Sequence, residues 1–354
     1  MSFQPRSARC LYWALLLLFF GHFTGKAVAF EPSPPGVLYP LGNQHHLHLN
    51  CQGSGSPTVI FDAGLGGDSL QWTRVQRLVA QYTRACSYDR AGMGWSERHF
   101  GPRTAGRMAS DLRNLLRKAD VPGPYVLVSH SFSSYTARIF ARRHPQDIAG
   151  LVFIDPSHED QILRFKDEFN INLVPSHRGF VTYQPALPAN MPEEVLATAK
   201  SLQWSRKRIE ATREELMGFR ESARQVATAP DLPAVPMLVL TRGVKGWPRE
   251  PRAEQMEALW LDLHRDLVSR SPTARHVVVP DSGHHIHLDN PNLVADGILL
   301  VLEQGWVERR RANSGAVLRH AGVDGASKGV GPGVEEWWAE RRPGRFTWSG
   351  YTSP

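Results

Sequence analysis

The stretch that decides the fold is residues 125–134, which reads YVLVSHSFSS. An apolar run leads straight into Ser131, and a helical pattern begins directly after it. The residues two positions to either side, Ser129 and Ser133, are both small. A serine on a sharp strand-to-helix turn is held in strained backbone geometry, and its neighbours must be small because the chain passes close to itself. The stretch therefore predicts that Ser131 is a nucleophile at the end of a buried strand.

Around this stretch, strand patterns and helix patterns alternate. Short, mainly apolar runs bounded by Gly, Asp, Ser or Pro predict strands at residues 44–51, 58–63, 85–89, 125–129, 151–155, 237–241 and 276–279. Apolar residues three and four apart predict helices at residues 70–81, 105–119, 135–143, 253–269 and 292–304. This alternation indicates an α/β fold, with a mostly parallel sheet and helices on both faces.

The N-terminal residues 1–29 have the order of a secretory signal peptide. Basic residues come first, an apolar run follows at residues 10–20, and small residues stand at 27–29. The run is shorter than the roughly 20 apolar residues that cross a bilayer, and an uncleaved membrane anchor is the alternative. Cleavage after Ala29 predicts a secreted or periplasmic protein in an oxidising compartment, where disulfides persist.

The formal net charge of +7 lies at the two ends of the chain. Residues 1–29 and residues 309–354 carry all of this excess, so residues 30–308 are neutral overall. A nucleic-acid binder usually carries a basic face on its folded domain, so we expect no nucleic-acid partner. The composition of residues 309–354 is typical of a basic, disordered tail. A strip for weak contact with a membrane surface or a partner is the alternative.

One segment, residues 157–235, breaks the alternation. It begins irregularly, punctuated by prolines, and becomes a charged helical segment over residues 193–228. Compact domains rarely spend so many residues on one connection unless it is functional. We expect a helical lid over the carboxyl ends of the strands, where open α/β sheets place their ligands. A helical excursion packed elsewhere is the alternative.

These motifs together resemble the α/β-hydrolase superfamily, of the lid-bearing AB hydrolase-1 type. Residues 61–68, FDAGLGGD, resemble the Gly-rich oxyanion loop of the family, and residues 88–96, YDRAGMGWS, resemble the loop after its fourth strand. Residues 282–284, SGH, resemble its histidine loop, and the motifs follow the family order. The resemblance covers residues 56–160 and 236–300. It implies an eight-stranded, mostly parallel sheet within a domain over residues 30–308.

The resemblance also implies the residues of the site. The backbone N–H groups of Leu65 and Phe132 would hold a developing oxyanion. His284 follows an apolar strand and a Ser-Gly turn, so it would reach the same sheet edge as Ser131 and act as its base. His285 and His287 are nearby alternatives.

The acid has more than one candidate. Family members usually place it after the strand at residues 237–241, where this chain offers no carboxylate before Glu250. Some members place it after the preceding strand, which here ends in Asp155. Asp155 keeps the chain order of serine, acid and histidine, and we favour it over Glu250 or Glu254.

A disulfide between Cys51 and Cys86 is implied as well. These cysteines fall on the segments that resemble the second and fourth strands of the family, which lie side by side in its sheet. An oxidising compartment would favour the bond, and two buried thiols are the alternative.

The histidine group His45, His46 and His48 does not predict a metal site. On a strand only two of these side chains face the same way, and no cysteine or acid completes a ligand set. We expect neither a metal nor a cofactor.

The sequence predicts an exported serine hydrolase that cleaves an ester-like or amide-like acyl bond of a small molecule through an acyl-enzyme on Ser131. The epoxide hydrolases and haloalkane dehalogenases of the family carry an aspartate there. A peptidase or lactonase on the same triad is one alternative. The other is a non-catalytic binding protein, because Ser129 and Ser133 stand where the family usually has glycine.

Overall fold

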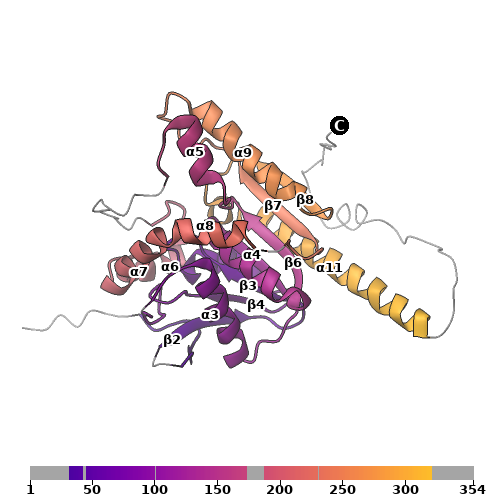
Figure 1. The fold of residues 1–354 in the computed structure, drawn as a ribbon. Coiled ribbons are helices and arrows are strands. Elements are labelled where there is room, and N and C mark those ends of the chain that lie inside the picture. Colours follow the sequence, from indigo (N-terminus) through magenta and orange to yellow (C-terminus); the bar gives the residue numbers. More distant parts are fainter. Residues whose placement is uncertain (1–31, 43–44, 100, 174–186, 230, 321–354) are drawn as a thin grey trace, which may run out of the picture. The chain divides into compact units, whose positions relative to one another are not determined.

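The structure is a computed structural model, and it describes residues 32–42, 45–99, 101–173, 187–229 and 231–320. Within this part of the chain, strands form one sheet of eight, in the order β1-β2-β4-β3-β5-β6-β7-β8 (Figure 1). The strands are β1 (Val37–Pro40), β2 (His46–Gln52), β3 (Thr58–Asp62), β4 (Ala85–Tyr88), β5 (Tyr125–His130), β6 (Ile148–Ile154), β7 (Met237–Arg242) and β8 (Ala274–Val279).

β2 pairs antiparallel with β1 and with β4, and the remaining strand pairs are parallel. This arrangement confirms the mostly parallel sheet. The strand that the sequence did not predict is β1, which lies at the sheet edge and whose residues are exposed or half-buried. Its short VLYP segment therefore lacks the buried apolar run that marks the other strands.

Helices cover both faces of the sheet. They are α2 (Thr73–Val79), α3 (Ala105–Lys118), α4 (Ser133–Arg143), α5 (Gln161–Phe169), α6 (Glu193–Gln203), α7 (Arg206–Met217), α8 (Phe219–Ala227), α9 (Ala253–Ser269), α10 (Ile286–Asp289) and α11 (Pro291–His320), with short 3₁₀ turns at η1 (Ser69–Trp72) and η2 (Pro145–Asp147). Side chains alternate along a strand, so the central strands β3, β5, β6 and β7 each contribute to a core on either face.

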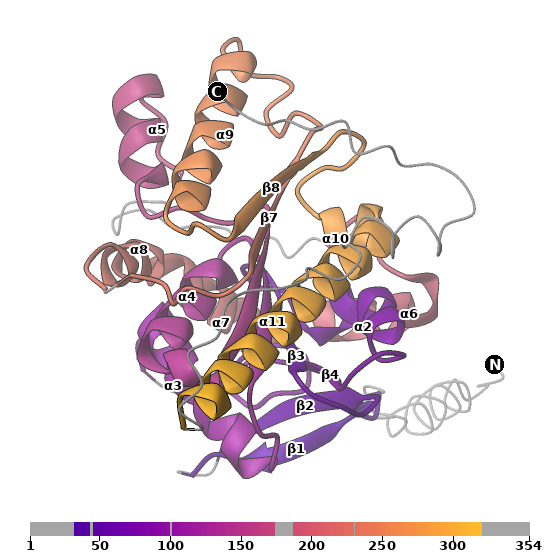
Figure 2. The same ribbon diagram turned by 90° about the vertical axis from the view of Figure 1, so that its right-hand side faces the viewer.

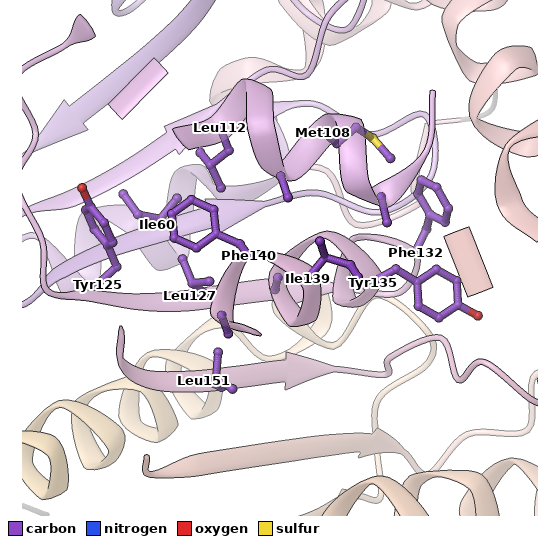
Figure 3. Packing of buried hydrophobic residues seen from close by; sticks show 14 of the residues in the cluster. Ile60, Met108, Leu112, Tyr125, Leu127, Phe132, Tyr135, Ile139, Phe140 and Leu151 are labelled. Atoms are coloured by element: carbon purple, nitrogen blue, oxygen red, sulfur yellow. The ribbon is translucent and has the colours of Figure 1, made fainter. Parts of the chain in front are cut away.

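On one face, Ile60, Leu127 and Leu151 of the central strands pack against α3 and α4 (Figure 3). On the other face, Val126 and Val152 pack against α2 and the first turns of α11. Figure 2 shows α11 crossing this face of the sheet. Full burial of each such side chain stabilises the fold by about 1.5–3 kcal/mol. The two cores hold the carboxyl ends of the parallel strands at one edge.

The insertion between β6 and β7 contains helices α5, α6, α7 and α8. α5 packs against α9, where Phe165 and Trp260 belong to one apolar cluster. α8 packs against the helix that follows Ser131, because the rings of Phe219 and Phe132 stack with centroids 5.1 Å apart. That the insertion acts as a lid stays a prediction.

The predicted disulfide is present. Cys51 and Cys86 lie opposite each other on the antiparallel pair β2 and β4, and their sulfur atoms are bonded. Closing a loop of 35 residues stabilises the folded state by roughly 4 kcal/mol in the chain-entropy account.

The described residues divide into two units, with the boundary after Trp306. α11 continues to His320, so residues 309–320 of the predicted tail are helical. That residues 309–354 form a separate tail stays a prediction. The rest of that tail and the predicted signal peptide, residues 1–29, lie outside the described residues. Among the residues that are described, no helix has the length and apolar character needed to cross a membrane.

Candidate active site

The turn after β5 holds Ser131 in left-handed backbone, with a φ of 54°. A side chain other than glycine is uncommon there, and such strain persists only where the surroundings enforce it. The Ser131 N–H donates to the carbonyl of Ile154, 3.0 Å away. The hydroxyl of Ser133 accepts the N–H of His130 at 3.0 Å and lies 2.8 Å from the carbonyl of Asp62. These bonds tie the turn to the ends of β3 and β6.

Ser131 and His284 lie within hydrogen-bond distance. His284 Nε2 is 3.0 Å from the Ser131 hydroxyl, and its Nδ1 is 2.6 Å from Asp155 Oδ2. Because an ionised carboxylate only accepts, Nδ1 carries the hydrogen and Nε2 is free to accept the serine proton. Of the alternative histidines, His287 is buried and stacks on Trp72 with ring centroids 4.4 Å apart. His285 lines the same cavity as Ser131, with its ring centroid 5.3 Å from that of His284.

Asp155 follows directly after β6, also in left-handed backbone, with a φ of 41°. Its buried carboxylate accepts hydrogen bonds from Arg242 Nη1 at 2.7 Å and from Trp260 Nε1 at 2.9 Å, in addition to His284. Burial raises the pKa of Asp155, but the bond from His284 and the charge of Arg242 outweigh it and hold the pKa well below its usual range. The side chain is therefore ionised at neutral pH.

Among the described residues, the glutamates considered as alternative acids form no hydrogen bond or ion pair with His284. Glu250 and Glu254 are both exposed, and Glu254 pairs with Lys245 at 3.1 Å. The structure thus brings Asp155, and not these glutamates, to the histidine.

Arg242 and Trp260 support the carboxylate and were not singled out from the sequence. The Arg242 guanidinium lies over the rings of both Trp247 and Trp260, 4.6 and 4.7 Å from their centroids, and the two rings contact each other edge to face. The sequence does carry a signal for Arg242: it is the last residue of β7, and the last residues of parallel strands lie at the edge of the sheet where the site forms. Trp260 lies in the middle of α9, where its pattern indicates only a core residue.

The loop that contains Leu65 lies against the serine turn. A Cβ on Gly64 would lie 2.7 Å from His130 Nδ1 and 3.4 Å from Ser131 Cβ, so only glycine allows this close approach. The N–H groups of Leu65 and Phe132 have no hydrogen-bond acceptor among the described residues. Two free donors therefore stand beside Ser131.

A cavity of about 280 Å³ opens at this place. Its lining residues come from the two site loops, the histidine loop and the insertion: Gly64, Leu65, Gly66, Gly67, Gln71, His130, Ser131, Leu187, Pro188, Arg208, His284 and His285. Arg208, on α7, is buried and pairs with Asp68. The insertion thus contributes both apolar and cationic surface to the cavity.

The three N-terminal histidines are separated by their partners. His46 Nδ1 lies 2.9 Å from Glu97, His48 Nδ1 lies 2.9 Å from Asp89, and His45 contacts the carbonyl of Gly42. Within the described ranges, no group of three or more His, Cys, Asp or Glu side chains is placed to hold a metal ion.

The strand order of the sheet and the serine on a strained strand-to-helix turn are those of an α/β-hydrolase fold. The chain belongs to the alpha/beta hydrolase family, whose model matches residues 59–297. This membership identifies it as a hydrolase.

Relatives and solved structures agree with this family. The uncharacterized protein YqjL of Bacillus subtilis is 30% identical over 245 residues, which cover 69% of this chain and 82% of the relative. A thermophilic esterase from Thermogutta terrifontis superposes with a TM-score of 0.55 at 22% identity, covering 76% of this chain and 98% of the esterase. The enol-lactonase from Burkholderia xenovorans LB400 superposes with a TM-score of 0.52 at 18% identity, covering 75% and 99%. At these identities the two structures show a shared fold alone.

Proposed function

We propose that the chain is a serine hydrolase that cleaves an ester-like or amide-like acyl bond of a small molecule. Ser131 is the nucleophile, His284 is the base, and Asp155 is the carboxylate of the triad. The observation that carries this proposal is the continuous chain of contacts from Ser131 through His284 to the buried Asp155. A serine, a base within hydrogen-bond reach and a carboxylate that orients the base are the parts that nucleophilic catalysis requires.

In the first half of the reaction, Ser131 Oγ attacks the acyl carbon while its proton passes to His284 Nε2. The carbonyl oxygen becomes an oxyanion, and the free N–H groups of Leu65 and Phe132 donate to it. Asp155 stabilises the positive imidazolium, since its carboxylate accepts the Nδ1 hydrogen. The carbon–leaving-group bond then breaks, and His284 returns the proton to the leaving group.

In the second half, water replaces the leaving group. His284 takes a proton from the water, the hydroxide attacks the acyl carbon, and the same two N–H groups hold the second oxyanion. The bond to Ser131 Oγ breaks, the serine recovers its proton from His284, and the carboxylic acid leaves.

The cavity limits the class of substrate. Its volume of about 280 Å³ lies just below the roughly 300–1,000 Å³ that small-molecule pockets usually have. We therefore expect a small acyl group. Export into an oxidising compartment belongs to this proposal, and the bond between Cys51 and Cys86 supports it.

Hydrolysis of 4-nitrophenyl esters of increasing chain length tests the proposed function. We expect the highest kcat/KM for short acyl groups, and we expect Ser131→Ala to lower kcat by about five to six orders of magnitude. Ser269→Ala, which removes an exposed hydroxyl on α9, should keep full turnover. Folded wild-type protein that hydrolyses no ester, amide or lactone would instead favour the non-catalytic binding protein.

A further inference from the structure

A buried carboxylate on the insertion contacts the loop that carries Leu65. Glu215, on α7, is fully buried, and its Oε2 accepts the backbone N–H of Gly66 at 3.0 Å. The same carboxylate accepts from Arg90 Nε at 2.8 Å and from Arg103 Nη2 at 2.9 Å. Burying an unpaired charge costs folding free energy, and these hydrogen bonds and ion pairs offset that cost for Glu215.

Arg90 completes the connection to the other side of Leu65. Its Nη1 donates to the carbonyl of Ala63 at 2.5 Å and to Asp62 at 2.6 Å, and its Nη2 donates to the carbonyl of Gly64 at 2.7 Å. With the bonds from Nε and Nη2 to Glu215, all five N–H groups of the guanidinium are used. The guanidinium has no freedom to rotate without losing several of these bonds.

The orientation of the Leu65 N–H follows from this clamp. In a planar trans peptide, the C=O of one residue and the N–H of the next point in opposite directions. Because the Gly64 carbonyl points at Arg90, the Leu65 N–H points away from Arg90. Gly64 itself lies against Ser131, and Leu65 lines the cavity. The bonds on either side of Leu65 therefore fix the peptide that carries its free donor.

We propose that Glu215 is a positioning residue for the oxyanion site: it holds Arg90 and Gly66 so that the Leu65 N–H stays aimed at the acyl oxygen. The inference rests on the proposed function of Ser131. It also means that the oxyanion site is complete only when α7 of the insertion is docked on the Leu65 loop. The residue itself does not touch the substrate.

The test compares Glu215→Gln with Glu214→Gln, its neighbour on the same helix, which is partly exposed and pairs with Arg98. Turnover is measured with 4-nitrophenyl acetate, and inhibition is measured with an aryl trifluoromethyl ketone. An active serine adds to the carbonyl carbon of this ketone, and the carbonyl oxygen becomes an oxyanion. We expect Glu215→Gln to lower kcat about 10- to 100-fold with KM changed less than about twofold, because a displaced donor acts on the transition state. The inhibition constant of the ketone should increase by the same factor. Glu214→Gln should have the kcat and the inhibition constant of the wild type.

Equal kcat in Glu215→Gln and wild type, or a lower kcat with unchanged ketone affinity, would overturn the inference. If Glu215→Gln does not fold, Glu215→Asp keeps the charge near the arginines but is too short to reach the Gly66 N–H, and it should show the same parallel losses. Wild-type protein without esterase activity would instead contradict the proposed function, so the two failures can be told apart.

Discussion

At the scale of single residues, the site depends on two side chains in left-handed backbone. Ser131 and Asp155 each follow a buried central strand, and conformations of this kind cost about 1–3 kcal/mol each. The sheet compensates for that cost, because the N–H of Ser131 donates to Ile154 and the N–H of Asp155 donates to the carbonyl of Leu240 at 2.7 Å. Strand ends thus hold both side chains toward His284.

Replacing the acid tests its assignment. In Asp155→Asn the amide can no longer stabilise the imidazolium and can present N–H groups where His284 needs an acceptor. We expect kcat for a short aryl ester to fall by about four orders of magnitude, whereas Glu250→Gln should keep wild-type turnover. Full turnover in Asp155→Asn together with loss in Glu250→Gln would place the acid at Glu250.

The sequence could indicate some of these residues and not others. Ser131, Asp155 and His284 each follow a strand pattern, and parallel strands bring their carboxyl ends to one edge. Glu215 offered no such signal, because it lies 125 residues from Arg90 in the chain and only the packing of the insertion joins them. Charged residues surround Glu215 on its helix, and this pattern predicts solvent exposure, whereas the structure buries the Glu215 side chain.

At the scale of elements, apolar runs decided how much of the sheet could be predicted. β3 and β5 are buried along their whole length, and their runs stand out in the sequence. β1 has one neighbour, β2, and no buried residue, so its sequence carries little strand signal. The contacts of the insertion helices could not be predicted either, since an amphipathic pattern marks an apolar face but not the element that covers it.

At the scale of the whole molecule, the formal net charge and the pKa values of the buried histidines bear on different properties, namely the substrate and the stability. The formal charge of +7 has its excess outside residues 30–308, so it says little about the substrate. The interior is more informative, because it holds several histidines that burial keeps neutral. Burial lowers the pKa of His264 to about 4 and that of His285 to about 4, and it holds the pKa of His130 well below its ordinary value.

Stability should therefore fall on mild acidification. Between pH 6.5 and pH 4 the unfolded chain binds protons that the folded chain does not, so the free energy of unfolding decreases as the pH falls through this window. His264 alone accounts for about 3 kcal/mol of that loss by pH 4. Glu215 adds to the loss only below about pH 4.5. Its pKa is raised by burial but lowered more by Arg90 and Arg103, to about 2.

Urea unfolding at pH 7, 5.5 and 4.5 measures this dependence. His264→Asn, which removes one titrating group from α9, should show a shallower decrease than the wild type. An unchanged free energy of unfolding between pH 7 and pH 4.5 would mean that these histidines are protonated or solvated in the folded protein.

The central claim is that Ser131 is an activated nucleophile, and labelling with a fluorophosphonate probe tests it most directly. The reagent forms a covalent bond with an activated serine, so intact mass should increase by one adduct and peptide mapping should place that adduct on Ser131. Ser131→Ala should remain unlabelled, whereas Ser269→Ala should label like the wild type. Folded wild-type protein that takes up no probe, or an adduct that persists in Ser131→Ala, would contradict the account.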